Sequence, residues 1–363
     1  MSEKRPLYRS RLVRGVAAGT GAALAAGWAA QHRAVARTRA STDEIVAEGL
    51  TIPEDCIEHD FEMDDGGRMH VIERGEGPPV VLLHGFMLSG ALWAHQLRDL
   101  AAHHRVIALD LRGHGRSVPG SSGFSMTEDS GLVDELRAEA RMSVAQQGSP
   151  ALRRMAVDVR TVLDALNVEH ALVVGHSMGG MVALQLAHDA PADEMRRRVA
   201  GLALVSTTGG PFTRVPGFGG VARLAGPVSA RAVGLADRWG VRTVASQDLR
   251  WWLTRMGFGA DAPAAQVRFV EGLHMATPAA TVAELLPAIA LFDLSKWLGT
   301  LELSVLVVVG SRDRLTPPRH ALRTAAALPH SELVELPRCG HMPMIERRHE
   351  FARLVEEFAA KLG

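Results

Sequence analysis

Ala171-Leu-Val-Val-Gly-His-Ser-Met-Gly-Gly180 is the stretch of sequence that decides the fold. Apolar, mostly β-branched residues lead directly into Gly175-His-Ser-Met-Gly179, and an apolar helical pattern follows from Met181 onward. The stretch therefore predicts a strand, a sharp turn and a helix. In that setting a Gly-x-Ser-x-Gly motif holds its serine on a strained elbow with the hydroxyl exposed beyond the strand. Ser177 also precedes a helix N-terminus, where free N–H groups favour developing negative charge.

Other apolar runs alternate with helical patterns along the chain. The runs that predict strands are residues 57–63, 68–73, 80–83, 105–110, 201–206, 304–310 and 333–336. Asp-Gly between the first two runs is typical of a hairpin. The regions that predict helices are residues 89–102, 134–147, the stretch after Ser149-Pro150, and the end of the chain from Phe351. This alternation predicts an α/β fold with a mostly parallel central sheet flanked by helices, and ligands bind beyond the carboxyl ends of such strands.

Two candidate partners for Ser177 follow later strands. A serine hydroxyl is a weak nucleophile that requires a base, and a third group must hold that base in place. Asp313 follows the run 304–310, and His341 lies in the loop after the last predicted strand. We expect both at the same edge of the sheet as Ser177. Without such partners, the motif would more often be a chance glycine-rich turn than a catalytic one.

From about residue 57 to its end, the chain resembles the α/β-hydrolase superfamily, in the serine-nucleophile branch of esterases and lipases with a helical cap. The matching stretches are His84-Gly-Phe86, Asp110-x-Arg-Gly-x-Gly-x-Ser117, Gly175-His-Ser-Met-Gly179, Gly310-x-x-Asp313 and Gly340-His341. The resemblance implies that Ser177 is the nucleophile, His341 the base and later the acid, and Asp313 the group that orients His341. It also implies an oxyanion hole made by the backbone N–H groups of Phe86 and Met178. A serine nucleophile argues against the epoxide hydrolase and haloalkane dehalogenase branches, which use a carboxylate.

Three other polar residues near these motifs are rivals for the same roles. His176 adjoins the nucleophile, but neighbours on a tight turn point in different directions, so we expect it to pack. We expect His84 to fix the oxyanion loop and Asp110 to hold the turn that follows it. The glycines of residues 111–117 do not form a dinucleotide fingerprint, because no helix with a later ribose-binding acid follows.

The strand and helix alternation stops for about ninety residues after the run 201–206. This predicts four regions: a tail and linker at 1–52, a first core part at 53–208, a helical cap at 209–298 and a second core part at 299–363. Most of the large apolar residues of the cap would form its own small core, and we expect a few to face the site. These residues are Phe212, Phe218, Trp239, Trp251, Trp252, Met256, Phe258, Phe269, Leu273, Met275 and Trp297. An apolar lining would exclude water and accept an apolar acyl or aryl group.

Composition and charge indicate which kinds of binding partner are expected. The 363 residues are 47% hydrophobic with zero formal net charge, so no general attraction to nucleic acid is expected. Residues 1–40 contain eight basic residues and one acidic residue, Glu3. The basic residues lie on both sides of the uncharged segment 15–30. That segment predicts a protein that is associated with a membrane and has a cytoplasmic N-terminus; the alternative is a cytoplasmic protein. Secretion is disfavoured, because Arg33 lies just before the possible cleavage site of a signal peptide. Cys56 and Cys339 match neither a disulfide framework nor a metal site, and no cofactor or metal is expected.

These observations predict a serine hydrolase that cleaves carboxylic esters or lactones with an apolar acyl or aryl group through an acyl-enzyme. A cofactor-free haloperoxidase or perhydrolase, a carbon–carbon bond hydrolase and an acyltransferase would use the same three residues, so these alternatives stay open. A binding protein without catalytic activity is the remaining hypothesis, because a fold does not fix a function.

Overall fold

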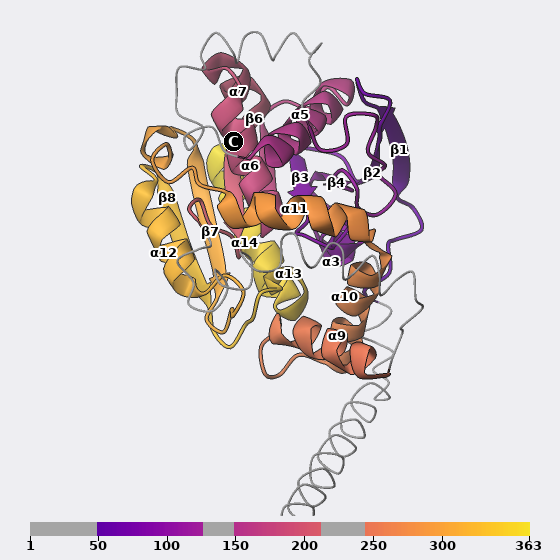
Figure 1. The fold of residues 1–363 in the computed structure, drawn as a ribbon. Coiled ribbons are helices and arrows are strands. Elements are labelled where there is room, and N and C mark those ends of the chain that lie inside the picture. Colours follow the sequence, from indigo (N-terminus) through magenta and orange to yellow (C-terminus); the bar gives the residue numbers. More distant parts are fainter. Residues whose placement is uncertain (1–48, 126–148, 212–243) are drawn as a thin grey trace, which may run out of the picture.

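An eight-stranded sheet forms the centre of the molecule in the computed structural model, which describes residues 49–125, 149–211 and 244–363. Its strands lie in the order β1-β2-β4-β3-β5-β6-β7-β8, and helices pack against both of its faces (Figure 1). The strands are β1 (Ile57–Glu62), β2 (Arg68–Arg74), β3 (Pro79–Leu83), β4 (Arg105–Leu109), β5 (Ala171–His176), β6 (Val199–Val205), β7 (Ser304–Gly310) and β8 (Ser331–Leu336). The α-helices are α3 (Ala94–Asp99), α5 (Pro150–Ala165), α6 (Met178–Asp189), α7 (Ala192–Arg198), α9 (Val244–Met256), α10 (Ala264–Ala276), α11 (Ala279–Leu291), α12 (Pro318–Ala327), α13 (Pro343–Glu346) and α14 (Arg348–Leu362). Two 3₁₀ turns are η1 (Gly90–Trp93) and η4 (Leu298–Thr300).

The mostly parallel sheet predicted from the sequence is confirmed. Strands β4, β3, β5, β6, β7 and β8 pair in parallel, whereas β1 with β2 and β2 with β4 are antiparallel. The predicted hairpin of β1 and β2 therefore forms one edge of the sheet. β3 and β5 are direct neighbours, with Leu83 opposite Gly175, so the loop after β3 and the turn after β5 leave the sheet side by side.

Both faces of the central strands are buried, which explains why these strands read as continuous apolar runs. In β3, Val81 belongs to the same core cluster as Val159 of α5. The next residue, Leu82, points to the other face and belongs to the cluster that contains Phe351 of α14. Successive side chains thus fill two separate apolar layers, one on each face of the sheet.

A buried ionic cluster joins the turn of the first hairpin to α5 and to the loop after β4. The Arg112 guanidinium donates to Asp158 of α5 at 2.6 Å and to Asp65 of the β1–β2 turn at 2.7 Å, and all three side chains are at most 1% exposed. Burial by itself would raise the pKa of Asp65, but the hydrogen bonds and charge of Arg112 hold that pKa well below its ordinary value. Arg112 therefore fixes the loop after β4 against two other elements.

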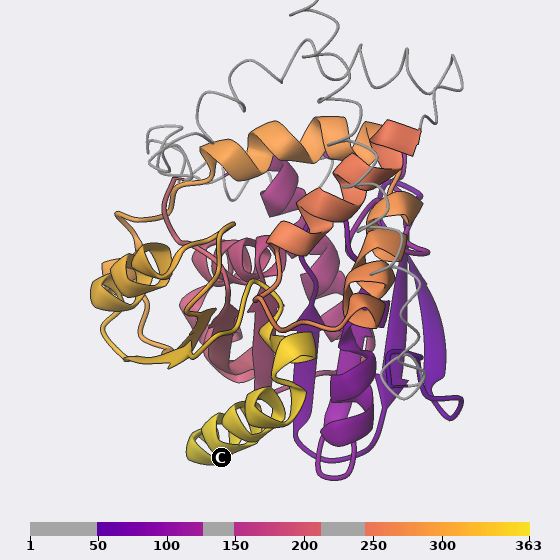
Figure 2. The same ribbon diagram turned by 90° about the horizontal axis from the view of Figure 1, so that it is seen from below.

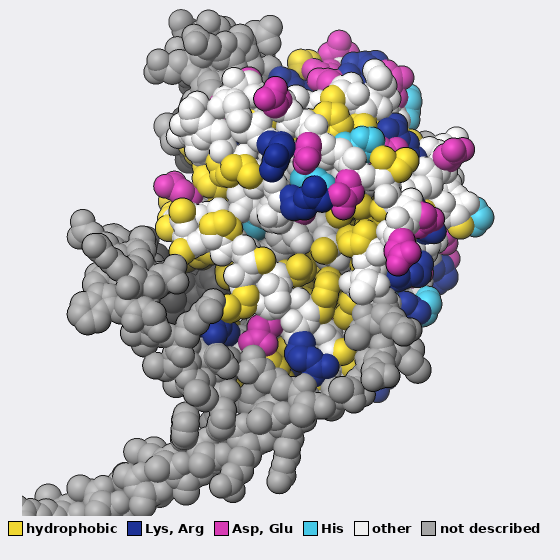
Figure 3. All heavy atoms as spheres, turned by 90° about the vertical axis from the view of Figure 1, so that its right-hand side faces the viewer, with side chains coloured by type: hydrophobic (Ala, Val, Ile, Leu, Met, Phe, Trp, Pro, Cys, Tyr) yellow, Lys and Arg dark blue, Asp and Glu magenta, His cyan; other side chains and the backbone are white. Residues whose placement is uncertain are grey.

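The face around the β1–β2 edge mixes acidic and basic side chains (Figure 3). Arg74 donates to Asp55 at 2.8 Å, and Arg116 pairs with Glu58. This face presents no field of one sign, in agreement with the balanced charge of the whole chain.

Some helices differ from the sequence prediction. The predicted helix at 89–102 is shorter, because the chain forms η1 before α3 begins at Ala94. Ser149 does precede α5, but its side chain makes no capping hydrogen bond. α7 and α12 are not predicted from the sequence; both are short and carry many polar side chains.

Parts of the predicted organisation lie outside the described residues: 1–48 with the basic tail, 126–148 with the predicted helix at 134–147, and 212–243 at the start of the predicted cap. The boundaries of the predicted cap and the membrane association of the tail therefore stay predictions. Among the helices that are described, none is long and apolar enough to cross a membrane. Within the segment 209–298 the chain forms α9, α10 and α11, which lie together on one side of the sheet (Figure 2).

Candidate active site

Ser177 lies on a sharp turn between β5 and α6. Its φ of 52° and ψ of −114° are outside the conformations that residues other than glycine usually adopt. Such strain costs about 1–3 kcal/mol and persists only where the surroundings hold it. Here the Ser177 N–H donates to the Val205 carbonyl of β6 at 2.9 Å, and the Gly180 N–H donates to the Ser177 carbonyl at 3.0 Å. The turn is therefore held on both sides.

The two glycines of the motif allow strand and helix to approach closely. A Cβ on Gly175 would lie 2.5 Å from the carbonyl oxygen of Gly179, and a Cβ on Gly179 would meet the carbonyl oxygen of Leu83 in β3. Neither neighbour is a flexible side chain, so any larger residue would push the backbones of β3, β5 and α6 apart. The motif thus supplies the room that the Ser177 turn needs.

His341 and Asp313 form a buried pair at the ends of β8 and β7. Nδ1 of His341 lies 2.8 Å from Oδ2 of Asp313, with side chains 4% and 0% exposed. The Thr316 hydroxyl donates to the same carboxylate oxygen at 2.7 Å, and the N–H groups of Leu315 and Thr316 donate to Oδ1 at 2.9 and 2.8 Å. Burial alone would raise the pKa of Asp313, but the charge of His341 and these hydrogen bonds hold it below its ordinary value. Asp313 is therefore a carboxylate near neutral pH, and the proton between the two groups is on Nδ1 of His341.

Thr316 is a site residue that the sequence analysis missed. Its hydroxyl also lies 3.2 Å from Nδ1 of His341, so it contacts both members of the pair. The signal was present in Asp313-Arg-Leu-Thr316, because an aspartate commonly accepts hydrogen bonds from groups two and three residues later.

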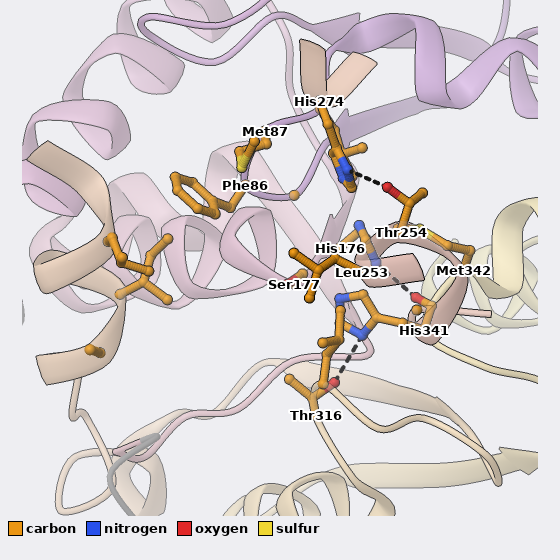
Figure 4. A pocket seen from close by; sticks show the side chains of 17 residues that line it. Phe86, Met87, His176, Ser177, Leu253, Thr254, His274, Thr316, His341 and Met342 are labelled. Carbon is orange, nitrogen blue, oxygen red and sulfur yellow. Dashed lines mark hydrogen bonds between the residues drawn. The ribbon is translucent and has the colours of Figure 1, made fainter. Parts of the chain in front are cut away.

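Ser177 and His341 line the same cavity, which has a volume of about 190 Å³. Figure 4 shows the His341 ring between Thr316, which is near one ring nitrogen, and Ser177, which lies on the side of the other. Among the described residues, no hydrogen bond joins the Ser177 hydroxyl to His341. Such contacts are often long without a substrate and shorten when one binds.

Aliphatic side chains make up most of the cavity wall, and they come from α9, α11 and the loops after β3, β7 and β8. These apolar residues are Phe86, Met87, Leu88, Leu253, Leu286, Ile289, Ala290, Leu315 and Met342. The helices α9, α10 and α11 each contribute to this wall, so they lie over the carboxyl ends of β3 and β5.

The predicted oxyanion donors are Phe86, in the loop after β3, and Met178, the first residue of α6. Neither N–H donates to another group in the part of the chain that the structure describes. Phe86 lines the cavity, and Met178 directly follows Ser177, which lines it too, at the N-terminus of α6, the end of a helix that favours negative charge.

Two buried histidines hold the loop that carries Phe86. His84 accepts the Leu111 N–H at 2.9 Å through Nε2, and its Nδ1 donates to the Gly85 carbonyl at 2.7 Å. Nε2 of His114 accepts the Met87 N–H at 3.2 Å. Met87 has a φ of 60°, in the left-handed region. Burial lowers the pKa of His114 to about 4, so this ring is neutral near pH 7 and accepts that hydrogen bond.

His176 and Asp110 have the structural contacts that the sequence analysis expected of them. His176 is fully buried, and its Nε2 donates to the backbone carbonyl of His341 at 2.9 Å. Asp110 accepts the N–H groups of Gly90 and Arg116 at 2.6 and 2.7 Å. Within the described ranges, no three His, Cys, Asp or Glu side chains gather as they would around a metal ion.

The model of the α/β-hydrolase fold family matches residues 78–348. This protein belongs to that family. As an α/β-hydrolase it is an enzyme. Ser177, Asp313 and His341 follow the ends of β5, β7 and β8.

Several hydrolases are similar to this α/β-hydrolase. A 2-hydroxy-6-oxo-6-phenylhexa-2,4-dienoate hydrolase of Burkholderia cepacia is 27% identical over 81% of this chain and 91% of its own. The solved structure of Est816, described as an N-acyl homoserine lactone degrading enzyme, is 26% identical with a TM-score of 0.60 and covers 83% of this chain and 100% of that one. An esterase from Exiguobacterium antarcticum shares the fold at 20% identity and a TM-score of 0.66, over 84% and 100% of the two chains.

The expectation that a few large residues of the predicted cap face the site is not met by those that the structure describes, and it stays a prediction for the others. Of those that the structure describes, none lines the cavity of this α/β-hydrolase. Trp251 and Phe258 are buried in the core cluster beneath, and Phe269 and Leu273 pack against it. Phe212, Phe218 and Trp239 lie outside the described residues. The side of α9 that faces the cavity carries Leu253 and Thr254 instead.

Proposed function

We propose that this α/β-hydrolase is a serine hydrolase that cleaves carboxylic esters or lactones with an apolar acyl or aryl group through an acyl-enzyme. One observation carries the proposal: His341, which Asp313 holds at 2.8 Å, lines the same apolar cavity as Ser177. A base that is held by a carboxylate and a strained serine thus face one mostly apolar cavity.

In the first half of the proposed reaction, the Ser177 oxygen attacks the scissile carbonyl carbon while Nε2 of His341 takes the hydroxyl proton. The oxygen that becomes negative accepts hydrogen bonds from the N–H groups of Phe86 and Met178; one such donor contributes about 10²–10³ in turnover. His341 then gives its proton to the departing alcohol oxygen as the carbon–oxygen bond breaks, which leaves the acyl group on Ser177.

The second half releases the acid. A water molecule attacks the acyl carbon while His341 takes one of its protons, and the bond to Ser177 then breaks as His341 returns that proton to the serine oxygen. Asp313 stabilises the positively charged ring in both halves, because its low pKa keeps it a carboxylate throughout.

The first experiment is labelling with a fluorophosphonate probe, followed by turnover of p-nitrophenyl esters of increasing acyl length and of lactones. We expect wild type and Ser295→Ala, which changes an exposed serine, to be labelled and to hydrolyse esters. Ser177→Ala should lose both, and activity that survives in Ser177→Ala would overturn the proposal. Labelling without turnover of any ester or lactone would keep the serine but assign the site to peroxide chemistry, carbon–carbon bond hydrolysis or acyl transfer.

A further inference from the structure

Two polar side chains of the cavity wall take no part in the proposed reaction. Thr254 of α9 and His274 of α10 line the cavity together with Ser177. The other polar side chains that the structure describes in the wall have roles given above, and these are His176, Ser177, Thr316 and His341. Figure 4 shows the His274 ring pointing into the cavity from the side opposite Thr316. The pair therefore adds a polar point to a mostly apolar wall, apart from the residues of the proposed reaction.

Thr254 fixes one nitrogen of the His274 ring. The Thr254 hydroxyl and Nδ1 of His274 are 3.1 Å apart, and Thr254 is only 4% exposed. The other ring nitrogen, Nε2, makes no hydrogen bond to a described residue. As far as the described residues go, Nε2 is therefore free to bind a group that occupies the cavity.

The position of the ring proton follows from these contacts. Burial lowers the pKa of His274 to about 4, and the nearby His341 adds to this effect, so the ring is neutral near pH 7 and has one N–H. If Thr254 donates to Nδ1, both groups are satisfied and the proton is on Nε2. The reverse arrangement would leave the Thr254 hydroxyl hydrogen without an acceptor among the described residues, and a buried polar hydrogen without a partner is costly. Nε2 is therefore a hydrogen-bond donor.

We propose that His274, oriented by Thr254, is a substrate-binding residue whose Nε2–H donates to a second carbonyl oxygen of the substrate, several bonds away from the scissile carbonyl. This inference rests on the proposed function and specifies its substrate: an ester or lactone that also carries a ketone or amide carbonyl. Among the described residues that line the cavity there is no Lys or Arg, so a neutral acceptor fits this wall better than a carboxylate. A site built to hydrogen-bond a substrate group discriminates against the analogue that lacks it, because its own polar atom is then left unpaired.

The test uses p-nitrophenyl alkanoates in which one chain methylene at a time is replaced by a carbonyl. We expect wild type to prefer one oxo ester over its methylene counterpart by about tenfold in kcat/KM, the size of one such hydrogen bond. His274→Phe should reduce this ratio to about one. His274→Gln, whose side-chain amide can still donate, should retain part of it, and Thr254→Val should lower it because Nδ1 loses its partner. His330→Phe makes the same chemical change at an exposed position and should leave the ratio unchanged.

A second readout does not depend on turnover. The dissociation constants of the same ester pairs are measured by calorimetry with Ser177→Ala, with and without His274→Phe. A preference that survives His274→Phe overturns the inference, and so does the absence of any preference while alkyl esters are hydrolysed. Failure of the proposed function looks different, because wild type would then hydrolyse neither ester and Ser177 would not be labelled, while calorimetry would still decide the role of His274. If His274→Phe does not fold, the Gln and Val variants give the same comparison.

Discussion

Asp313 and Thr316 contact the same histidine but have unequal roles. In Asp313→Asn the amide oxygen should keep the N–H groups of Leu315 and Thr316, so that the NH2 group faces Nδ1 of His341 and cannot accept its proton. This favours the wrong ring tautomer, so kcat should fall by about 10⁴. Thr316→Val leaves the carboxylate in place and removes one of its donors, so kcat should fall only about tenfold. Steady-state ester hydrolysis measures both, and equal losses would contradict the assignment of Asp313 as the orienting group.

Substitutions of His114 show whether the loop after β3, which carries the proposed oxyanion donor Phe86, depends on a residue outside that loop. His114→Leu would leave the Met87 N–H without its acceptor, in a loop that already contains a left-handed residue. We expect kcat to fall about tenfold or more with little change in KM, because the loop acts on the charge that develops in the transition state. His114→Gln retains an acceptor and should recover most of the loss. If both variants keep full activity, His114 does not position the loop.

At the scale of the elements, the contact between β3 and α6 depends on one hydrogen atom of Gly179. Gly179→Ala should lower the free energy of unfolding by about 1–3 kcal/mol, because the new methyl group meets the backbone of β3. Gly272→Ala in α10 is the matched control: a Cβ there has nothing within 4 Å, and alanine favours the helix by about 0.5–1 kcal/mol. Urea denaturation of the two variants should therefore give opposite signs, and a Gly179→Ala variant as stable as wild type would contradict the packing described for the turn.

How much of this arrangement could be predicted depends on how local each feature is. Ser177 and Asp313 each follow an apolar run directly, so the sequence places them at strand ends. The position of β4 between β2 and β3 depends on pairing between distant segments, which no local pattern records. The same holds for Thr254 and His274, which meet only because α9 packs against α10, and for the aliphatic rather than aromatic wall of the cavity.

The whole molecule should lose stability in weak acid. Burial lowers the pKa of His95, His114 and His274 to about 4 and that of His176 to about 3. The unfolded chain binds protons at these side chains below about pH 6.5, whereas the folded protein does not until about pH 4. Because the unfolded state binds more protons in this window, the free energy of unfolding falls as the pH falls, by about 1.4 kcal/mol per pH unit for each ring.

Urea midpoints between pH 7 and pH 5 measure this slope. His95→Gln removes one buried ring and should make the slope shallower, while His330→Gln removes an exposed ring and should leave it unchanged. A midpoint that does not move over this range would show that the buried rings accept protons without unfolding.

The order of the strands also bears on how the enzyme is made. Ser177, the proposed nucleophile, directly follows β5 near the middle of the chain, whereas Asp313 and His341 follow the last two strands. A ribosome therefore completes and releases the Ser177 turn long before Asp313 and His341 emerge. If the three residues act as proposed, the serine stays unreactive through most of synthesis, and a chain cut short before β8 lacks the base that would activate it.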